Sequence, residues 1–232
     1  MIPIVFVHGI RLSGTMWGPV AALVDGPSTA PDLPGHGSRG GEPFTLDGAV
    51  EAVASAVDGP AVLVGHSLGG FVAIAAAARY PERVAALVVG GCTVRPRGAF
   101  LAGYRFAAGL AGRHPELADR LSVRGFQRAL PPPVAAAMVA GGVRCAVMPS
   151  VVTALSDLDP PACLRAYPGP VHLFNGARDP FRAEERRFLA ASPGAHLTIV
   201  PARGHIGVMA ETETLAALVT EARRQTQKAS PT

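Results

Sequence analysis

The segment Gly65-His66-Ser67-Leu68-Gly69 places a serine between two glycines in the pattern Gly-x-Ser-x-Gly. It directly follows the apolar segment 61–64 and opens an alanine-rich helical pattern. A strand, a sharp turn and a helix in this order form a nucleophile elbow, in which larger residues at the two glycine positions would collide with the neighbouring strand and helix. A serine hydroxyl is a poor nucleophile unless a base removes its proton, so the pattern predicts a partner elsewhere in the chain.

Two polar residues further along the chain are candidates for that partner and its support. Asp179 follows the strand-like segment 171–175, and His205 follows the strand-like segment 196–200. Taken alone, an aspartate before a proline is typical of a turn, and a lone histidine is typical of a loop. Together with Ser67 they occur in the order Ser, Asp, His, each beyond the carboxyl end of an expected strand, which favours a catalytic triad.

The elements that must position these residues alternate between apolar strands and amphipathic helices, as in a parallel sheet covered on both faces. The pattern predicts strands over 2–7, 61–64, 84–89, 171–175 and 196–200, and helices over 47–57, 68–79 and around 215–222. Between Thr93 and Arg165 the alternation is interrupted. Helical patterns near 100–110, 116–130, 134–143 and 150–158 occur there without a convincing strand.

The motifs together resemble the α/β-hydrolase superfamily over nearly the whole chain apart from this insertion. They are Phe6-Val7-His8-Gly9 with Trp17 eight residues after the glycine, the turn-rich segment 30–37, the glycine-serine segment 65–70, the segment 175–179 and Gly204-His205. The resemblance implies that Ser67 is the nucleophile, His205 the general base and then acid, and Asp179 the carboxylate that orients it. It further implies an oxyanion hole made by the backbone N–H groups of Ile10 and Leu68. It calls for no cofactor and no metal.

The same resemblance implies a fold and a division of the chain. We expect an α/β-hydrolase core of about six mostly parallel strands, formed by residues 1–92 and 166–224. Residues 93–165 are expected to form a helical cap over the site, and residues 225–232 a flexible tail. Apolar cap residues that could line the acyl pocket, or hold the cap helices together, are Phe100, Leu101, Tyr104, Phe106, Phe126, Met138 and Met148.

Departures from related families narrow the reaction. A serine at position 67, where haloalkane dehalogenases and epoxide hydrolases have aspartate, disfavours both of those activities. Phe71 stands where a menaquinone-pathway lyase of similar size typically has arginine, which weakens that interpretation. The leading hypothesis is hydrolysis of a carboxylic ester or thioester of a small to medium, anionic or neutral substrate through an acyl-enzyme. The alternatives are a lyase or cyclase that uses the same site, and a non-catalytic ligand-binding protein.

Other candidate residues have structural interpretations. His8 is expected to hold its loop by hydrogen bonding, His36 to belong to a turn, and His66 to flank the nucleophile without a chemical role. Asp32 precedes Ser67, against the expected order, and is interpreted as a turn-holding carboxylate. The three cysteines are widely spaced, which predicts neither a disulfide framework nor a zinc site.

Composition restricts the partners. The chain has 232 residues, 49% of them hydrophobic, and a net charge of +4, which fits a packed domain. The basic residues include a single lysine and no run longer than two, so nucleic acid is not an expected partner. The longest apolar stretch, 71–78, is far shorter than the roughly 20 residues that cross a bilayer, and no leader peptide is visible, so we expect a cytoplasmic protein without a membrane partner.

The positive charge is concentrated in the expected cap. Residues 93–165 contain nine arginines and four acidic residues. This excess favours a small-molecule acyl substrate that carries a carboxylate or phosphate, or an acidic acyl-carrier protein that presents the acyl group. The competing interpretation is an ordinary solvated arginine surface.

Overall fold

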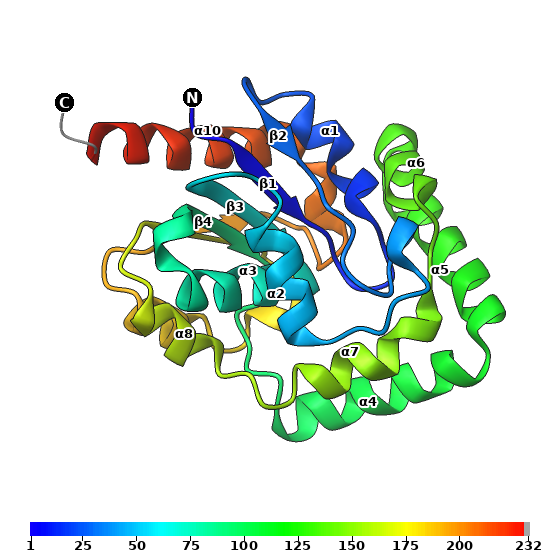
Figure 1. Cartoon of the computed structure of the whole chain (residues 1–232). Helices are drawn as coiled ribbons and strands as arrows, with labels where there is room; N and C mark the ends of the chain where they lie inside the picture. Colours follow the sequence, from blue (N-terminus) through cyan, green and yellow to red (C-terminus); the bar gives the residue numbers. More distant parts are fainter. Residues whose placement is uncertain (230–232) are drawn as a thin grey trace.

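Six short segments of the chain form one sheet in the spatial order β2-β1-β3-β4-β5-β6, and every neighbouring pair is parallel. The strands are β1 (Ile4–Val7), β2 (Ser28–Thr29), β3 (Ala61–His66), β4 (Val84–Gly90), β5 (Val171–Gly176) and β6 (His196–Val200). This computed structural model describes residues 1–229, apart from the side chains of residues 99, 100 and 227–229. The expected α/β fold with about six parallel strands is confirmed (Figure 1).

Ten α-helices surround or extend this sheet in the described part of the chain. They are α1 (Gly18–Ala21), α2 (Leu46–Ala54), α3 (Leu68–Arg79), α4 (Gly98–Arg113), α5 (Pro115–Ala129), α6 (Pro132–Ala140), α7 (Met148–Ala154), α8 (Pro160–Ala166), α9 (Glu185–Ala191) and α10 (Thr212–Ala229). Helix α3 has the predicted bounds. Helix α2 ends three residues earlier than predicted, ahead of a turn in which Gly59 has a φ of 87°.

Strand β1 illustrates why the strands are continuously apolar. Its four side chains are fully buried, with Ile4 and Phe6 in one hydrophobic cluster and Val5 and Val7 in another. Successive side chains of a strand point to opposite faces, so the two clusters lie on opposite faces of the sheet. Helices α2, α3, α8 and α9 contribute to the cluster of Val5, and α1 and α10 to that of Ile4. Both faces are therefore covered, as parallel sheets require.

The loop after β1 is fixed by Trp17. Its indole N–H donates to the carbonyl oxygen of Val7 at 3.0 Å, its ring stacks on Phe6 with centroids 5.2 Å apart, and the residue has no exposed surface. A buried indole needs such a hydrogen-bond acceptor. The contact holds the segment that contains Gly9 and Ile10 against the carboxyl end of the sheet.

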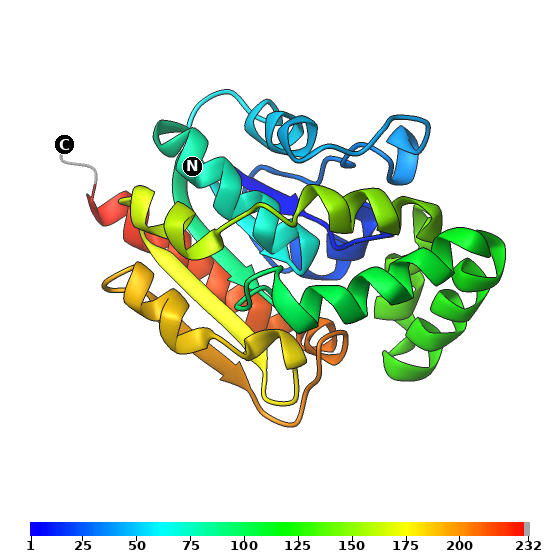
Figure 2. The ribbon, with the colours of Figure 1, turned by 90° about the horizontal axis from the view of Figure 1, so that it is seen from below.

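Helices α4 to α7 lie beyond the carboxyl ends of the strands in both views of the molecule (Figures 1 and 2). Helix α4 packs against α7, and α5 packs against α6. Helix α8 packs instead against α3 and α9, with Leu164 buried in the cluster on that face of the sheet. Residues 160–165, which the expected cap includes, thus lie with the layer of helices that covers the sheet.

The C-terminal helix extends further than the sequence pattern predicts. Helix α10 continues through Ala229, so residues 225–229 of the expected tail are helical. The reason is burial: Arg223 and Thr226 are both buried, and the Thr226 hydroxyl donates to the carbonyl oxygen of Arg223 at 2.7 Å. Residues 230–232 of that tail lie outside the described residues.

Among the described helices, none alone has the length and apolar composition needed to span a membrane. The pair Pro132–Ala140 and Cys145–Ala154 meets the requirement only when joined, and it is bent by 63° at the break.

Candidate active site

The turn between β3 and α3 holds Ser67 in a strained backbone conformation, with φ of 58° and ψ of −120°. Non-glycine residues rarely adopt positive φ, and such strain clusters at functional sites. A Cβ on Gly65 would lie 2.3 Å from the carbonyl oxygen of Gly69, and one on Gly69 would lie 2.0 Å from that of Val7. Only glycine fits at both positions, and the backbone N–H of Ser67 donates to Gly90 at 2.8 Å to fix the turn. The structure thus has the elbow geometry that the motif predicts.

Three side chains predicted to act together form one chain of hydrogen bonds. Nδ1 of His205 lies 2.9 Å from Oδ2 of Asp179, and Nε2 of His205 lies 3.0 Å from Oγ of Ser67. A carboxylate can only accept, so Nδ1 donates to Asp179. In the neutral ring Nε2 then carries no proton and accepts from the Ser67 hydroxyl. The structure brings together all three residues, from the ends of β3, β5 and β6.

Asp179 is held rigidly. Its side chain has no exposed surface, and Oδ1 accepts a hydrogen bond of 2.8 Å from the backbone N–H of Phe181. The two carboxylate oxygens therefore have different partners, the loop backbone and His205. This arrangement fixes the orientation of the imidazole.

Two aromatic rings enclose His205. The ring of Phe181 stacks on it with centroids 4.2 Å apart, and the ring of His66 lies 4.7 Å away. Burial, and next to it the neighbouring His205, holds the pKa of His66 well below its ordinary value, so His66 is neutral. Its Nε2 is buried without a hydrogen-bond partner. The sequence did not single out Phe181, because its role depends on a turn that brings it back over His205.

The described residues include one group of side chains that could hold a metal ion. The ligand atoms of His66, Asp179 and His205 lie within 4.8 Å of one another. Those of Asp179 and His205 already bond to each other, and the second nitrogen of His205 bonds to Ser67. These mutual bonds explain the positions of Asp179 and His205 without an ion.

A second group of polar residues supports the loop after β1. Nε2 of His8 accepts from the backbone N–H of Leu33 at 2.9 Å, and Nδ1 donates to the carbonyl oxygen of Gly9. Burial, and then the nearby His36, lowers the pKa of His8 to about 3, so its ring is neutral. Asp32 accepts from the backbone N–H groups of Gly14 and Ser38 at 2.8 and 2.7 Å. These residues have the structural roles that the sequence suggests.

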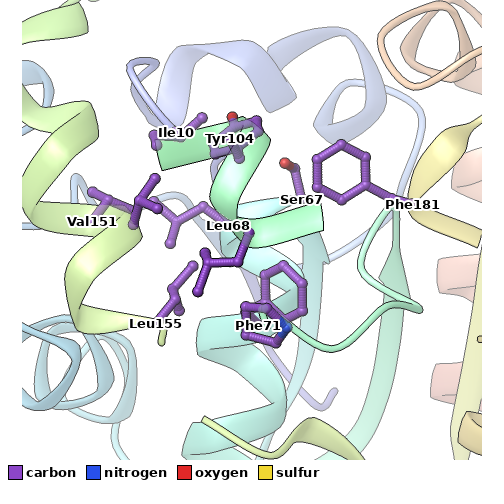
Figure 3. A pocket seen from close by; sticks show the side chains of 11 residues that line it. Ile10, Ser67, Leu68, Phe71, Tyr104, Val151, Leu155 and Phe181 are labelled. Carbon is purple, nitrogen blue, oxygen red and sulfur yellow. The ribbon is translucent and has the colours of Figure 1, made fainter. Parts of the chain in front are cut away.

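The proposed oxyanion donors border a pocket beside Ser67. Leu68 is the first residue of α3, where backbone N–H groups have no partner within the helix. Ile10 and Leu68 line the pocket together with Ser67. Figure 3 shows the Ser67 side chain between Tyr104 and Phe181, with Val151 of α7 and Leu155, which directly follows α7, across the pocket.

This pocket has an almost wholly apolar lining. Its wall includes Phe71, Leu101, Tyr104, Val152 and Leu155. Leu101 and Tyr104 are among the cap residues expected near substrate. Phe71 of α3 contributes an apolar ring to the same wall. Such a pocket suits an apolar acyl chain.

A second pocket also reaches Ser67. It is lined by Arg11, Tyr104, Phe126, Met138 and His205, among others. Phe126 and Met138 therefore meet the expectation for cap residues, whereas Phe106 is 78% exposed and Met148 lines neither pocket. The side chain of Phe100 lies outside the described residues. The sequence did not predict that Arg11 lines this pocket. Its position two residues after His8-Gly9 is the signal in the sequence that could have indicated it.

Comparison with known proteins places this geometry in a family. The model of the alpha/beta hydrolase family matches residues 4–218. The chain belongs to the alpha/beta hydrolase family. Among solved structures, this family member resembles a thermophilic esterase from Thermogutta terrifontis with a TM-score of 0.77 and 22% identity, over 97% of this chain and 90% of that one. At that identity the likeness concerns the fold.

Two curated relatives of this α/β hydrolase match over shorter stretches. Lipase LipV of Mycobacterium tuberculosis is 46% identical over 89 residues, which are 36% of this chain and 34% of the relative. A pimeloyl-[acyl-carrier protein] methyl ester esterase of Neisseria meningitidis is 48% identical over 62 residues, which are 26% of this chain and 24% of the relative. The matches thus span about a third and a quarter of these relatives.

Proposed function

We propose that this α/β hydrolase is a serine hydrolase that cleaves a carboxylic ester or thioester through an acyl-enzyme. The observation that carries the proposal is the unbroken hydrogen-bond chain from Asp179 through His205 to Ser67, beside a pocket bordered by Ile10 and Leu68. The relatives named as a lipase and as methyl ester esterases support the ester bond as the target.

The geometry supports a two-step reaction. Oγ of Ser67 forms a bond to the carbonyl carbon while its proton passes to Nε2 of His205, and the oxyanion accepts from the N–H groups of Ile10 and Leu68. His205 then gives that proton to the leaving alcohol or thiol as the C–O or C–S bond breaks. A water molecule attacks the acyl-enzyme, passes its proton to His205, and releases the acid and the Ser67 hydroxyl. Asp179 stabilises the imidazolium in both steps.

Helices α4 to α7 serve in this proposal as the cap over the acyl chain. The wall of the apolar pocket includes Leu101 and Tyr104 from α4, Val151 and Val152 from α7, and Leu155 directly after α7. An apolar wall that excludes water strengthens the electrostatic stabilisation of the transition state. The substrate consistent with this pocket has an apolar acyl chain of small to medium length.

An acyl-carrier protein is a second candidate source of the acyl group. Arg105, Arg113, Arg120, Arg124 and Arg128 of α4 and α5 are exposed, and in the described part of the chain none forms an ion pair, unlike Arg95 and Arg97. An exposed basic surface attracts an acidic partner. Several curated relatives are named for a carrier-linked substrate, which agrees with this proposal.

The central test is the Ser67→Ala variant. We expect it to lose labelling by a fluorophosphonate probe and to lose about 10⁴-fold or more in kcat/KM toward p-nitrophenyl esters. Ser55→Ala, at an exposed position at the end of α2, is the control and should keep both. Ester turnover in Ser67→Ala within about tenfold of the parent would contradict the proposal.

The carrier-protein candidate has its own test. We expect Arg120→Glu with Arg124→Glu to raise KM for a pimeloyl methyl ester on acyl-carrier protein about tenfold, and to leave hydrolysis of the free methyl ester intact. An equal effect on both substrates, or on neither, would remove the carrier protein from the proposal.

A further inference from the structure

Arg11 is the one arginine or lysine that lines either pocket at Ser67 among the described residues. It follows Ile10 directly, so the loop that offers an oxyanion N–H also carries this guanidinium. The arginine excess of the expected cap lies elsewhere: none of the arginines of residues 93–165 lines these two pockets. Among the arginines of the described chain, Arg11 is therefore the one placed to bind an anionic group of a substrate at Ser67.

The guanidinium of Arg11 has poor partners. Its Cζ lies 5.4 Å from the ring centroid of Phe126, and Nη1 reaches the sulfur of Met148 at 3.9 Å. Its Nε is buried without a hydrogen-bond partner. Asp119 of the adjacent α5 accepts from the backbone N–H of Cys145 at 2.6 Å and forms no ion pair with Arg11. Buried polar atoms are normally hydrogen-bonded, so this half-buried guanidinium, whose Nε is buried and unpaired, has unused binding capacity.

Arg11 is held beside the second pocket in a strained backbone conformation. Its φ is 63°, in the left-handed region that arginine rarely adopts. The carbonyl oxygen of Arg11 accepts from the backbone N–H of Arg144 at 2.9 Å, which ties the loop to the segment before α7. A strained residue held by its surroundings next to a nucleophile is typical of a functional position.

The two pockets meet at Ser67 but differ in what else they contain. Both include Ile10 and Tyr104, whereas the apolar pocket includes Phe71 and Leu155, and the second includes Arg11 and His205. In the proposed reaction His205 protonates the leaving group. The leaving alcohol or thiol therefore faces the second pocket, and the acyl chain lies in the first.

We propose that Arg11 binds an anionic oxygen group, carboxylate or phosphate, on the leaving-group part of the substrate. This inference rests on the proposed hydrolase function and specifies its substrate class: an ester or thioester of an apolar acid with an anionic alcohol or thiol. The planar guanidinium binds either group by paired hydrogen bonds. Arg11 is thus a specificity-determining residue.

The test compares hexanoyl esters of 3-hydroxybenzoate, 3-hydroxyphenyl phosphate and 3-hydroxybenzamide, which differ in the charge on the leaving group. The measured quantity is the ratio of kcat/KM for each anionic ester to that for the neutral amide. We expect Arg11→Met to lower this ratio about 10- to 100-fold relative to the parent. The control Arg113→Met, at an exposed arginine outside both pockets, should keep the parent ratio. An unchanged ratio in Arg11→Met would overturn the proposal, and comparison of the two anionic esters identifies the preferred group.

Two further measurements keep the outcome decisive. If Arg11→Met does not fold, Arg11→Lys takes its place and should lower the ratio about 3- to 10-fold, because an ammonium lacks the planar fork; an unchanged ratio would overturn the proposal. Monomethyl adipate and methyl hexanoate place the charge on the acyl side instead. A preference for the charged ester of this pair that disappears in Arg11→Met would overturn the leaving-group assignment.

Failure of the hydrolase proposal is separately visible. Hydrolysis of the neutral ester by the parent and not by Ser67→Ala supports the reaction whatever Arg11 does. If the parent cleaves none of these esters, calorimetric binding of the intact esters to Ser67→Ala still tests Arg11. The anionic esters should bind about tenfold more tightly than the neutral one, and this difference should disappear in the double variant with Arg11→Met. Equal affinities would overturn the inference.

Discussion

The ring of Phe181 stacks on the imidazole of His205, with an interplanar angle of 21° and a centroid separation of 4.2 Å. The same residue donates its backbone N–H to Asp179. Phe181, in the turn after β5, thus restricts the orientation of both His205 and Asp179. In the proposed mechanism Phe181 is a positioning residue, since it fixes the plane in which His205 exchanges protons.

Removing this ring should disorder the base without changing its chemistry. We expect Phe181→Ala to lower kcat toward p-nitrophenyl butyrate about 10- to 100-fold, because small misplacements of a catalytic group are costly. Phe181→Tyr keeps the stacked ring and should retain most of the activity. The split between kcat and KM is the second readout, since a misplaced base lowers kcat while the binding of substrate, and so KM, should change little. A kcat unchanged in Phe181→Ala would show that the backbone alone positions His205.

The close packing of the turn between β3 and α3 predicts that a larger residue at Gly69 destabilises the protein. Gly69→Ala places a Cβ 2.0 Å from the carbonyl oxygen of Val7, so strand β1 and helix α3 must separate. We expect a loss of about 3 kcal/mol or more in the free energy of unfolding, together with loss of fluorophosphonate labelling.

Gly103 provides the matched control for that substitution. It lies inside α4, and a Cβ there would meet nothing within 4 Å. Gly103→Ala should therefore stabilise the protein by about 0.5 to 1 kcal/mol, as alanine favours helix. Urea unfolding of both variants distinguishes close packing at Gly69 from a general intolerance of added methyl groups.

The sequence could predict the proposed triad because parallel strands end at the same edge of a sheet. Ser67, Asp179 and His205 each follow a strand whose position the sequence predicts, so the fold alone brings them close. Strand β2 could not be predicted, since its two residues are defined by pairing with Ile4 and Val5 and carry no pattern of their own. Helices α8 and α9, of seven residues each, are similarly too short for a clear hydrophobic period.

Side-chain direction in loops was also beyond the sequence. The turn that brings Phe181 over His205 and the left-handed φ of Arg11 are set by tertiary contacts. The basic excess of residues 93–165 was visible, but its distribution was not. Seven of the nine arginines lie on the exposed faces of α4 and α5 or pair with Glu184 or Asp159, and none of the nine lines the pockets at Ser67.

The apolar lining of the pocket at Leu155 predicts that a larger side chain there changes the preferred length of the acyl chain. Leu155, which directly follows α7, lines this pocket. The larger side chain in Leu155→Phe would fill part of it. We expect kcat/KM for p-nitrophenyl octanoate to fall about tenfold or more, and that for the acetate to change much less. Leu117→Phe, at a half-exposed position on α5, is the control. A uniform loss for all chain lengths would mean that the acyl chain does not enter this pocket.

His8 predicts a measurable pH dependence of stability. Its pKa is about 3 in the folded chain and about 6.5 when unfolded, so the unfolded state binds more protons between these values. The contribution of His8 to the free energy of unfolding is fully present above pH 6.5, and it decreases as the pH falls toward 3. Between pH 7 and pH 5 this loss amounts to about 2 kcal/mol.

Replacing this histidine should therefore flatten the stability profile. His8→Gln keeps an acceptor for the N–H of Leu33 but does not titrate, so it should be less stable than the parent at pH 7 and lose about 2 kcal/mol less on going to pH 5. Urea unfolding at pH 5, 6 and 7 measures the difference. The exposed His114→Gln is the control and should keep the parent profile. Parallel profiles for parent and His8→Gln would mean that His8 is protonated in the folded chain at pH 5, which its burial and its hydrogen bond from Leu33 both oppose.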